Sequence, residues 1–316
     1  MRLNARKISL VAVCAIAIAA CNPTETPIPT TPTPPPSTPA AQISGSPVRV
    51  GILNIDSAVS VNERYAPLLH YLEEKTGHPF QMVPLTQESQ FAEVAAGNLD
   101  FVVNNPLAAV QLRRLYDTDF LVTHSRPKTG TQFGGSIIVR RDRAIETLED
   151  LKGKKAACVD FQTAAAGCVF QIDYLKQRGF NPFKDFSRFV ENESQDNIVL
   201  AVLNGTVDVG FIRTGQLERM VEKGLIESVD VVKILNPAED NFAYSHTTAL
   251  YPEWTIAALK ETDPQLKAEV KTALLNIPPD RPELKAARIE GFIPAADYSE
   301  LDRLIENLKL KSWDIR

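Results

Sequence analysis

The sequence has 316 residues, of which 44% are hydrophobic and 23% are charged, and its formal net charge is −5 at pH 7. This length predicts two domains or one large one with ample buried cores. The acidic balance excludes a dedicated nucleic-acid-binding protein, which needs clustered Lys and Arg, and four cysteines are too few for a disulfide-scaffold protein.

The first predicted element is a lipoprotein signal peptide over residues 1–20. It begins with three basic residues and no acidic one, and a short apolar run follows from Ile8 to Ala20. Such a run is too short to span a bilayer and is typical of a signal-peptide core. It ends in small residues followed by Cys21, which resembles the bacterial lipobox. We therefore expect Cys21 to be acylated, with palmitate among its acyl groups, and the protein to be anchored by lipid outside the cytoplasm, in the periplasm or at the cell surface. An ordinary cleaved signal peptide is the alternative.

The next segment, residues 21–46, is predicted to be a tether that begins at the lipidated Cys21. Residues 23–39 contain eight prolines and six threonines. Proline fixes φ and removes a backbone donor, so this segment is expected to be extended and semi-rigid. A proline-rich ligand for another domain is the alternative.

Strands and helices alternate at short spacing from residue 47 to residue 316, which predicts an α/β fold of parallel sheets with crossover helices. The first series has strands at 48–53, 80–85 and 100–103 and helices at 62–75, 88–96 and from Pro106 onward. The second series has strands at 136–140, 155–160, 186–190, 207–212 and 231–234 and helices at 148–151, 167–178, 196–204 and 215–223. A strand is then expected at 244–250, followed by helices at 253–259, 264–276, 282–289 and 299–309.

Several segments of this region resemble the phosphate, phosphite and phosphonate substrate-binding proteins of ABC transporters. The segments are 51–53, 65–68, 72–77, 96–101, 148–154 and 201–208. The resemblance implies the type 2 periplasmic-binding-protein fold, in which two doubly wound lobes are joined by two crossover strands and close over a ligand. Lobe 1 would comprise about 48–136 and 246–316, and lobe 2 about 137–245. It also implies a monomeric binding protein rather than an enzyme, without a cofactor, whose partner is an ABC permease.

In such a fold the ligand lies beyond the carboxyl ends of the strands, where helices begin. Helix N-termini offer unpaired N–H groups that suit oxyanions, and an arginine there can act as a fixed cation. The candidate ligand-binding residues at these positions are Asn104, Asn105, Thr163, Ala164, Ala165, Gly167, Cys168, Ser194, Gln195, Asp196, Arg213 and Thr214. The alternative is structural, because Asn, Ser, Thr and Asp commonly cap helices and Arg213 could pair with Glu218 or Asp208.

Three segments depart from the family pattern. A Ser-Thr-Ser-Gly type loop is replaced by residues 163–167, a Gly-Gly-His-Asp type motif by 193–196, and Phe-Gly-Pro by 104–106. A phosphonate dianion would lose several charge-assisted hydrogen bonds, so phosphonate itself is disfavoured. Other segments resemble the periplasmic input domain of tetrathionate-sensor histidine kinases, namely 123–127, 133–135, 209–214, 217–220 and 248–254.

We therefore expect a small anionic ligand, phosphonate-like or a sulfur oxyanion, captured by lobe closure for an ABC importer. The alternative is a ligand sensor that acts through a separate two-component kinase, since we expect no kinase domain in this chain. A thiol-dependent oxidoreductase is a minor alternative that rests on the two remaining cysteines. No metal site is expected, because the four histidines are scattered.

Cys158 and Cys168 flank the candidate loop at a spacing of ten. In an oxidising compartment such a pair can form a disulfide that staples the loop between strand and helix. Two further interpretations stay open. Cys168 could be a reactive thiol near a helix N-terminus, or both cysteines could be inert buried thiols.

Overall fold

The structure is a computed structural model that describes residues 45–54, 58–192 and 194–310. The signal peptide, Cys21 and the tether up to residue 44 lie outside the described residues, so these assignments stay predictions. The segment from Ile43 onward forms one compact unit. Among the described residues, every helix is too short or too polar to cross a bilayer.

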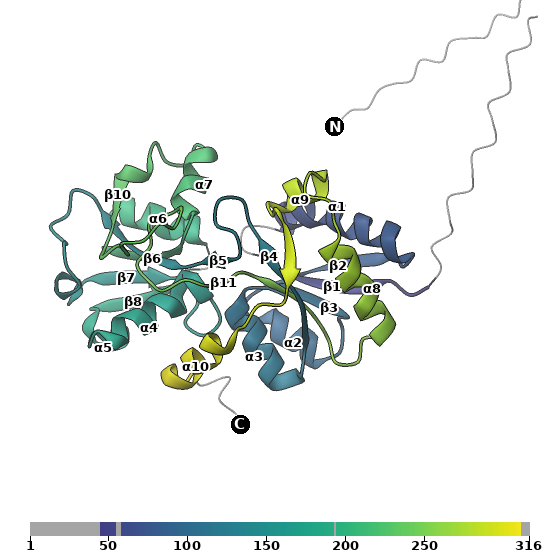
Figure 1. Ribbon diagram of the computed structural model, residues 1–316. Helices are drawn as coiled ribbons and strands as arrows, with labels where there is room; N and C mark the ends of the chain where they lie inside the picture. Colours follow the sequence, from purple (N-terminus) through teal and green to yellow (C-terminus); the bar gives the residue numbers. More distant parts are fainter. Residues whose placement is uncertain (1–44, 55–57, 193, 311–316) are drawn as a thin grey trace, which may run out of the picture. The chain divides into compact units, whose positions relative to one another are not determined.

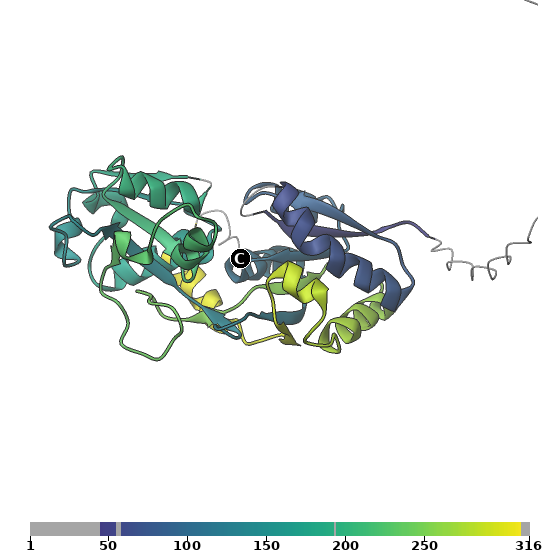
Figure 2. The same cartoon turned by 90° about the horizontal axis from the view of Figure 1, so that it is seen from above.

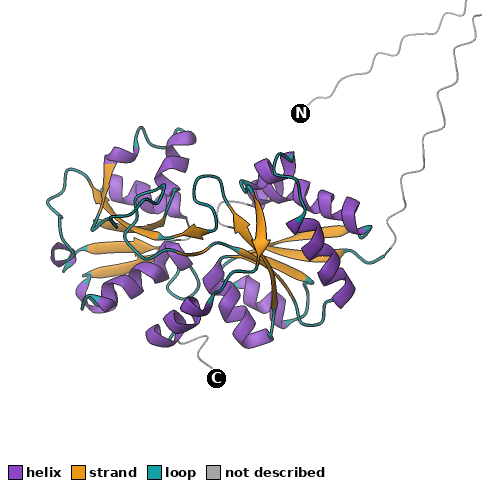
Figure 3. Cartoon of the chain, viewed as in Figure 1, coloured by secondary structure: helices purple, strands orange, loops and turns teal. Residues whose placement is uncertain are grey.

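Lobe 1 is built on a six-stranded sheet in the order β13-β4-β12-β3-β1-β2 (Figure 1). The strands are β1 Val48–Leu53, β2 Phe80–Leu85, β3 Phe101–Asn104, β4 Asp119–Ser125, β12 Thr255–Ala258 and β13 Gly291–Pro294. The helices are α1 Ala58–Thr76, α2 Ser89–Ala95, α3 Pro106–Tyr116, α8 Pro264–Leu275, α9 Pro282–Ala287 and α10 Ser299–Leu308. Figure 3 shows these helices on both faces of the sheet, which explains why its central strands are buried throughout.

Lobe 2 is built on a five-stranded sheet in the order β10-β6-β9-β7-β8. The strands are β6 Gly135–Arg140, β7 Lys155–Cys158, β8 Arg188–Glu191, β9 Val209–Arg213 and β10 Val232–Ile234. The helices are α4 Phe170–Gln177, α5 Pro182–Asp185, α6 Gln195–Leu203 and α7 Gln216–Glu222, with a π-helical turn at Ala165–Val169 and 3₁₀ turns at Glu149–Leu151 and Val229–Val231. The apolar faces of these elements meet in cores on both sides of the sheet.

Two chain segments cross between the lobes and pair with each other. Strands β5 (Gln132–Phe133) and β11 (Tyr251–Pro252) form an antiparallel ladder that lies between the two sheets (Figures 1 and 2). The ring of Tyr251 stacks on that of Phe170 with centroids 4.0 Å apart, which fastens the crossover to lobe 2. The predicted pair of lobes with two crossover strands is therefore confirmed.

Parts of the secondary-structure prediction are wrong. Parallel pairing holds only for β1 with β2 and β3 and for β7 with β8 and β9, whereas β4, β6, β10, β12 and β13 pair antiparallel. The predicted helix at 253–259 is strand β12, because a short apolar run that is buried on both faces cannot be assigned by periodicity. The segment 244–250 is not a strand; there the Thr247 and Thr248 side chains accept the backbone N–H groups of Ile137 and Gly135. Strands β4 and β13 are elements that we did not predict.

Candidate ligand-binding site

A cavity of about 840 Å³ lies where the carboxyl ends of strands from both lobes meet the crossover segments. Lobe 1 and the crossovers contribute Asn54, Thr86, Gln87, Glu88, Asn105, Phe133 and Trp254. Lobe 2 contributes Val159, Asp160, Ala164, Ala165, Ala166, Gly167, Glu191, Asn192, Ser194, Gln195, Asn197 and Arg213. The size suits a small-molecule ligand.

The first predicted helix start places one of its two asparagines in the cavity. Asn105 is the N-cap of α3; its side-chain oxygen accepts the N–H of Ala108 at 3.1 Å, and its Nδ2 donates to the carbonyl of Thr163 at 3.0 Å. Asn104 does not line the cavity; it is fully buried and its Nδ2 donates to Gln90 Oε1 at 3.2 Å. Both side chains therefore have a structural role, Asn105 as a helix cap and Asn104 as a buried hydrogen-bond donor.

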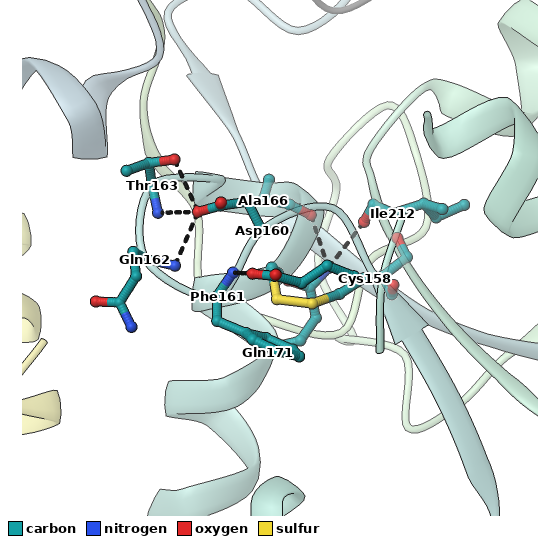
Figure 4. Close-up of a disulfide and its surroundings, with 11 residues drawn as sticks. Cys158, Asp160, Phe161, Gln162, Thr163, Ala166, Gln171 and Ile212 are labelled. Atoms are coloured by element: carbon teal, nitrogen blue, oxygen red, sulfur yellow. Dashed lines mark hydrogen bonds between the residues drawn. A yellow bond between two sulfur atoms is a disulfide. The ribbon is translucent and has the colours of Figure 1, made fainter. Parts of the chain in front are cut away.

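The predicted loop between β7 and α4 forms one wall of the cavity with small side chains. Ala164, Ala165 and Gly167 line it, whereas Thr163 and Cys168 do not. The Thr163 hydroxyl lies 2.8 Å from Asp160 Oδ1, and Cys168 is joined to Cys158 by a disulfide (Figure 4). Methyl groups rather than free hydroxyls therefore face the ligand space here.

At the start of α6, two of the three predicted residues line the cavity. Ser194 is the N-cap and accepts the N–H of Asn197, and Gln195 Oε1 accepts the backbone N–H of Arg213 at 2.8 Å. Asp196 lies outside the cavity, where its carboxylate pairs with Arg219 at 3.2 Å and Lys223 at 3.4 Å. Asp196 is therefore a structural residue of lobe 2.

Arg213 lines the cavity at the end of β9, and its partner is neither of the predicted ones. Its Nη2 lies 3.4 Å from Glu253 Oε1, and its Nε donates to the carbonyl of Thr214. Asp208 instead accepts the N–H of Lys155. Thr214 does not line the cavity, because its hydroxyl accepts the N–H of Gly134.

Glu253 is the centre of a buried charge group behind the cavity. It is fully buried in the second crossover, and its Oε1 also lies 2.8 Å from Nε of Arg126 in the first crossover. Burial lowers the pKa of Arg213 to about 10, although Glu253 counteracts this. The two guanidinium groups share one carboxylate, so the group keeps a net positive charge beside the cavity.

The prediction missed several lining residues, although a signal existed for some of them. Asn54 and Thr86 directly follow the parallel strands β1 and β2, which is the rule that pointed to Asn105. Phe133 and Trp254 come from the crossover segments, for which the sequence gives no comparable signal. Among the described residues, no group of three or more His, Cys, Asp or Glu side chains could hold a metal ion.

Similarity to known proteins covers most of the chain. The tetrathionate sensor histidine kinase of Salmonella typhimurium is 29% identical over 283 residues, which is 84% of this chain. The chain spans only 46% of that relative's length.

Solved structures share the fold. PhnD1 from Prochlorococcus marinus, solved with methylphosphonate, has a TM-score of 0.69 at 15% identity and covers 83% of this chain and 98% of its own. A binding-protein component of an ABC phosphonate transporter from Pseudomonas aeruginosa has a TM-score of 0.68 at 17% identity, with 84% and 86% covered. A Xanthomonas citri protein bound to ATP has a TM-score of 0.67 at 19% identity, with 85% and 100% covered. At these identities the likeness establishes the fold alone.

The family assignment rests on the sequence itself. Residues 50–299 match the family described as ABC transporter, phosphonate, periplasmic substrate-binding protein. This match confirms the resemblance seen in the sequence segments, and the two-lobed architecture agrees with it. The chain belongs to the periplasmic phosphonate substrate-binding proteins of ABC transporters.

Proposed function

We propose that this protein is a lipid-anchored extracytoplasmic binding protein that captures a small oxyanion by lobe closure and delivers it to an ABC permease. The proposal rests on the position and the hydrogen bonding of Arg213. Its guanidinium is mostly buried, lines the cavity and makes only two hydrogen bonds to described residues, to Thr214 and Glu253. An arginine has five N–H donors, so donors remain for a ligand oxygen.

The composition of the cavity favours an oxyanion of low charge density. Ala164, Ala165 and Ala166 present no donors from their side chains, and three carboxylates, those of Glu88, Asp160 and Glu191, also line the space. A phosphonate dianion would meet one guanidinium and three like charges. A sulfonate-type end group, with one charge spread over three oxygens, fits a single arginine better. The similarity to a tetrathionate sensor supports a sulfur oxyanion in particular.

Isothermal titration calorimetry with methylphosphonate, phosphite, sulfate, thiosulfate and tetrathionate tests the proposal. We expect tetrathionate, whose two sulfonate ends each carry a single charge, to bind more tightly than methylphosphonate. Tight binding of methylphosphonate would refute the argument that Ala164, Ala165 and Ala166 leave too few hydrogen-bond donors for a phosphonate. Binding of no member of the panel, or equal affinities in wild type and Arg213→Ala, would refute the anion site.

A sensory role is the second candidate, and the 29% identity to a sensor kinase favours it. The two roles differ in what deletion of the gene does to cells. A transport protein is needed for uptake of the radiolabelled ligand, whereas a sensor is needed for the transcriptional response while uptake continues. The disulfide gives the thiol-dependent alternative no exposed sulfur, since Cys158 and Cys168 are both fully buried. We do not propose that activity.

The lipid anchor has its own test. Cys21→Ser should leave the protein in the soluble fraction of cells, whereas wild type should sediment with membranes and carry acyl chains detectable by mass spectrometry. Wild type found in the soluble fraction would contradict the anchor.

A further inference from the structure

The turn that follows β7 belongs to lobe 2 but is held by lobe 1. Gln111 of α3 donates through Nε2 to the carbonyl of Gln162 at 2.8 Å, and Asn105 donates to the carbonyl of Thr163 at 3.0 Å. The Thr163 hydroxyl also lies 2.9 Å from Oε1 of Gln87. Two neighbouring residues of lobe 2 thus receive contacts from three amide side chains of lobe 1.

Most of the side chains in these inter-lobe contacts are buried. Gln111 is fully buried, and Asn105 and Thr163 are 5% and 4% exposed. A buried amide that loses its partner keeps its desolvation penalty, so such a contact is either made or replaced by water that must first enter. The geometry of the turn therefore sets where lobe 2 meets lobe 1.

The turn itself is shaped from within lobe 2. Asp160 Oδ1 accepts the N–H groups of Gln162 at 2.9 Å and Thr163 at 2.7 Å, which closes the turn (Figure 4). The ends of the loop are tied by the Cys158–Cys168 disulfide and by the hydrogen bond from Val159 N–H to the Gly167 carbonyl at 3.0 Å. The turn thus lies inside a covalently closed ring of the backbone.

The ring has a second contact surface, because its members Val159, Asp160 and Gly167 line the cavity together with the alanines between them. A shift of the ring would therefore change the lobe contact and the cavity wall together. Without the disulfide, only non-covalent contacts hold the ring in place.

We propose that the Cys158–Cys168 disulfide is a positioning element that holds the carbonyls of Gln162 and Thr163 against Gln111 and Asn105, and so stabilises this arrangement of the two lobes in the protein without ligand. The inference goes beyond the proposed function, because it concerns the protein without ligand. Its test can fail while the anion site stands, and the reverse is equally possible.

The test compares hydrogen exchange in wild type and Cys158→Ala/Cys168→Ala, where alanine avoids burying an unpaired hydroxyl. We expect the amides of the first turn of α3, at Ala108 and Ala109, to exchange about fivefold faster or more in the variant, since the N-cap Asn105 loses its anchor at Thr163. Helix α8 is a matched control within lobe 1. Helix α8 also begins with proline, and its N-cap Asp263 accepts the N–H of Leu266 at 3.0 Å. Neither Asp263 nor Leu266 contacts the disulfide-closed ring.

A disulfide that only stabilises lobe 2 as a whole would leave α3 unchanged or would accelerate α3 and α8 alike. Either result would overturn the proposal. The variant Asn105→Asp adds a second readout, since it removes the donor to Thr163 but keeps the N-cap oxygen. In that background, removing the disulfide should accelerate exchange in α3 by less than about twofold, because the two changes act through the same contact. Fully additive effects would contradict this coupling.

If Cys158→Ala/Cys168→Ala does not fold, the experiment instead measures how loss of the lobe contacts changes the rate at which the disulfide is reduced. Gln111→Met and Asn105→Asp both keep the disulfide, and the latter also keeps the N-cap oxygen. Both should expose the disulfide to dithiothreitol about threefold faster or more than wild type, with released thiols trapped by iodoacetamide and counted by mass. Equal rates in all three proteins would refute the positioning role.

Discussion

The side-chain oxygen of Gln195 accepts the backbone N–H of Arg213 at 2.8 Å, which joins the start of α6 to the end of β9 within the cavity wall. An N–H group can only donate, so this bond fixes the orientation of the Gln195 amide. Its NH₂ group is the end near Gly167, and a Cβ at Gly167 would lie only 3.2 Å from Nε2. Gln195 therefore offers donors to the ligand space beside the guanidinium of Arg213.

The first prediction concerns Gln195→Glu. The acceptor for Arg213 N–H is kept, but the donors are replaced by a negative charge, so anion affinity should fall by about 100-fold or more. Calorimetry with the tightest anion of the panel measures the loss. Asn197→Asp is the control, because it adds the same charge at an exposed lining position and should cost less than about tenfold. Equal losses in both variants would show that Gln195 has no specific role.

The second prediction concerns Arg213→Met. Burial lowers the pKa of Arg213 to about 10, so the fold disfavours the charged form, and Glu253 retains Arg126 as a partner in the variant. The melting temperature without ligand should therefore stay unchanged or rise, while anion affinity drops by about 10- to 100-fold. Arg219→Met is the control, since Arg219 pairs with Asp196 outside the cavity and its loss should leave affinity intact. A variant that loses stability and binding together would contradict the assignment.

The third prediction concerns Glu253→Gln. The change leaves Arg126 and Arg213 without their shared carboxylate in a buried position, and we expect a loss of about 3–5 kcal/mol in the free energy of unfolding. Urea unfolding measures it. Asp196→Asn breaks a comparable group whose side chains are 16–33% exposed and should cost less than about 1 kcal/mol. A similar small loss at Glu253 would mean that water reaches the group.

The fourth prediction concerns Gln171, which is fully buried in α4. Its Nε2 donates to the carbonyls of Ala166 at 2.7 Å and Ile212 at 2.9 Å, which ties the cavity loop to β9 (Figure 4). Gln171→Leu removes these hydrogen bonds and should lower the free energy of unfolding by about 1–3 kcal/mol. Lys176→Met, an exposed change on the same helix, should lower it by less than about 0.5 kcal/mol. Comparable losses at the two positions would refute the role of Gln171.

The fifth prediction concerns pH. Burial, reinforced by Arg126 and Arg64, lowers the pKa of His124 well below 6.5, and its ring packs edge-on against Phe292. The unfolded chain therefore binds one more proton than the folded chain below about pH 6.5, so stability falls on acidification by up to about 1.4 kcal/mol per pH unit from this group. His124→Leu should remove this part of the slope between pH 7 and about pH 5.

The matched control for the pH experiment is His70→Leu, because the His70 side chain is 70% exposed. Its unfolding free energy should follow the wild-type slope. A slope that is the same in His124→Leu and wild type would show that His124 binds protons equally in the folded and unfolded protein, and would contradict the lowered pKa.

The sequence predicted the fold and part of the cavity lining for a physical reason. Residues at the end of a strand or at the start of the helix that follows it are placed by these elements, so Asn105, Gln195 and Arg213 could be assigned to the cavity from their positions alone. The hydrogen-bond and ion-pair partners of the candidate residues could not be assigned in this way. Thr163, Asp196 and Thr214 have polar side chains near the predicted site, but each of these side chains binds another residue of the protein, and the local sequence does not reveal these partners.

The crossover region was the least predictable part. Glu253 lies in a segment that was predicted to be helical, because a four-residue strand between two others has no periodicity of its own. The carboxylate that balances Arg213 was therefore not considered, although Glu218 and Asp208 were. The bond between Cys158 and Cys168 was foreseen as one of several outcomes, since spacing cannot separate a disulfide from two buried thiols.

The carboxylate of Glu253 serves the crossover and the cavity at once, because one of its oxygens contacts Arg126 and Arg213 alike. A substitution of Glu253 therefore changes both the contact that affects lobe movement and the charge beside the ligand cavity. A selection for altered ligand preference should repeatedly recover changes in the crossover segments, at residues such as Glu253 that do not themselves line the cavity. Relatives that have changed ligand should in turn differ in how easily their lobes open.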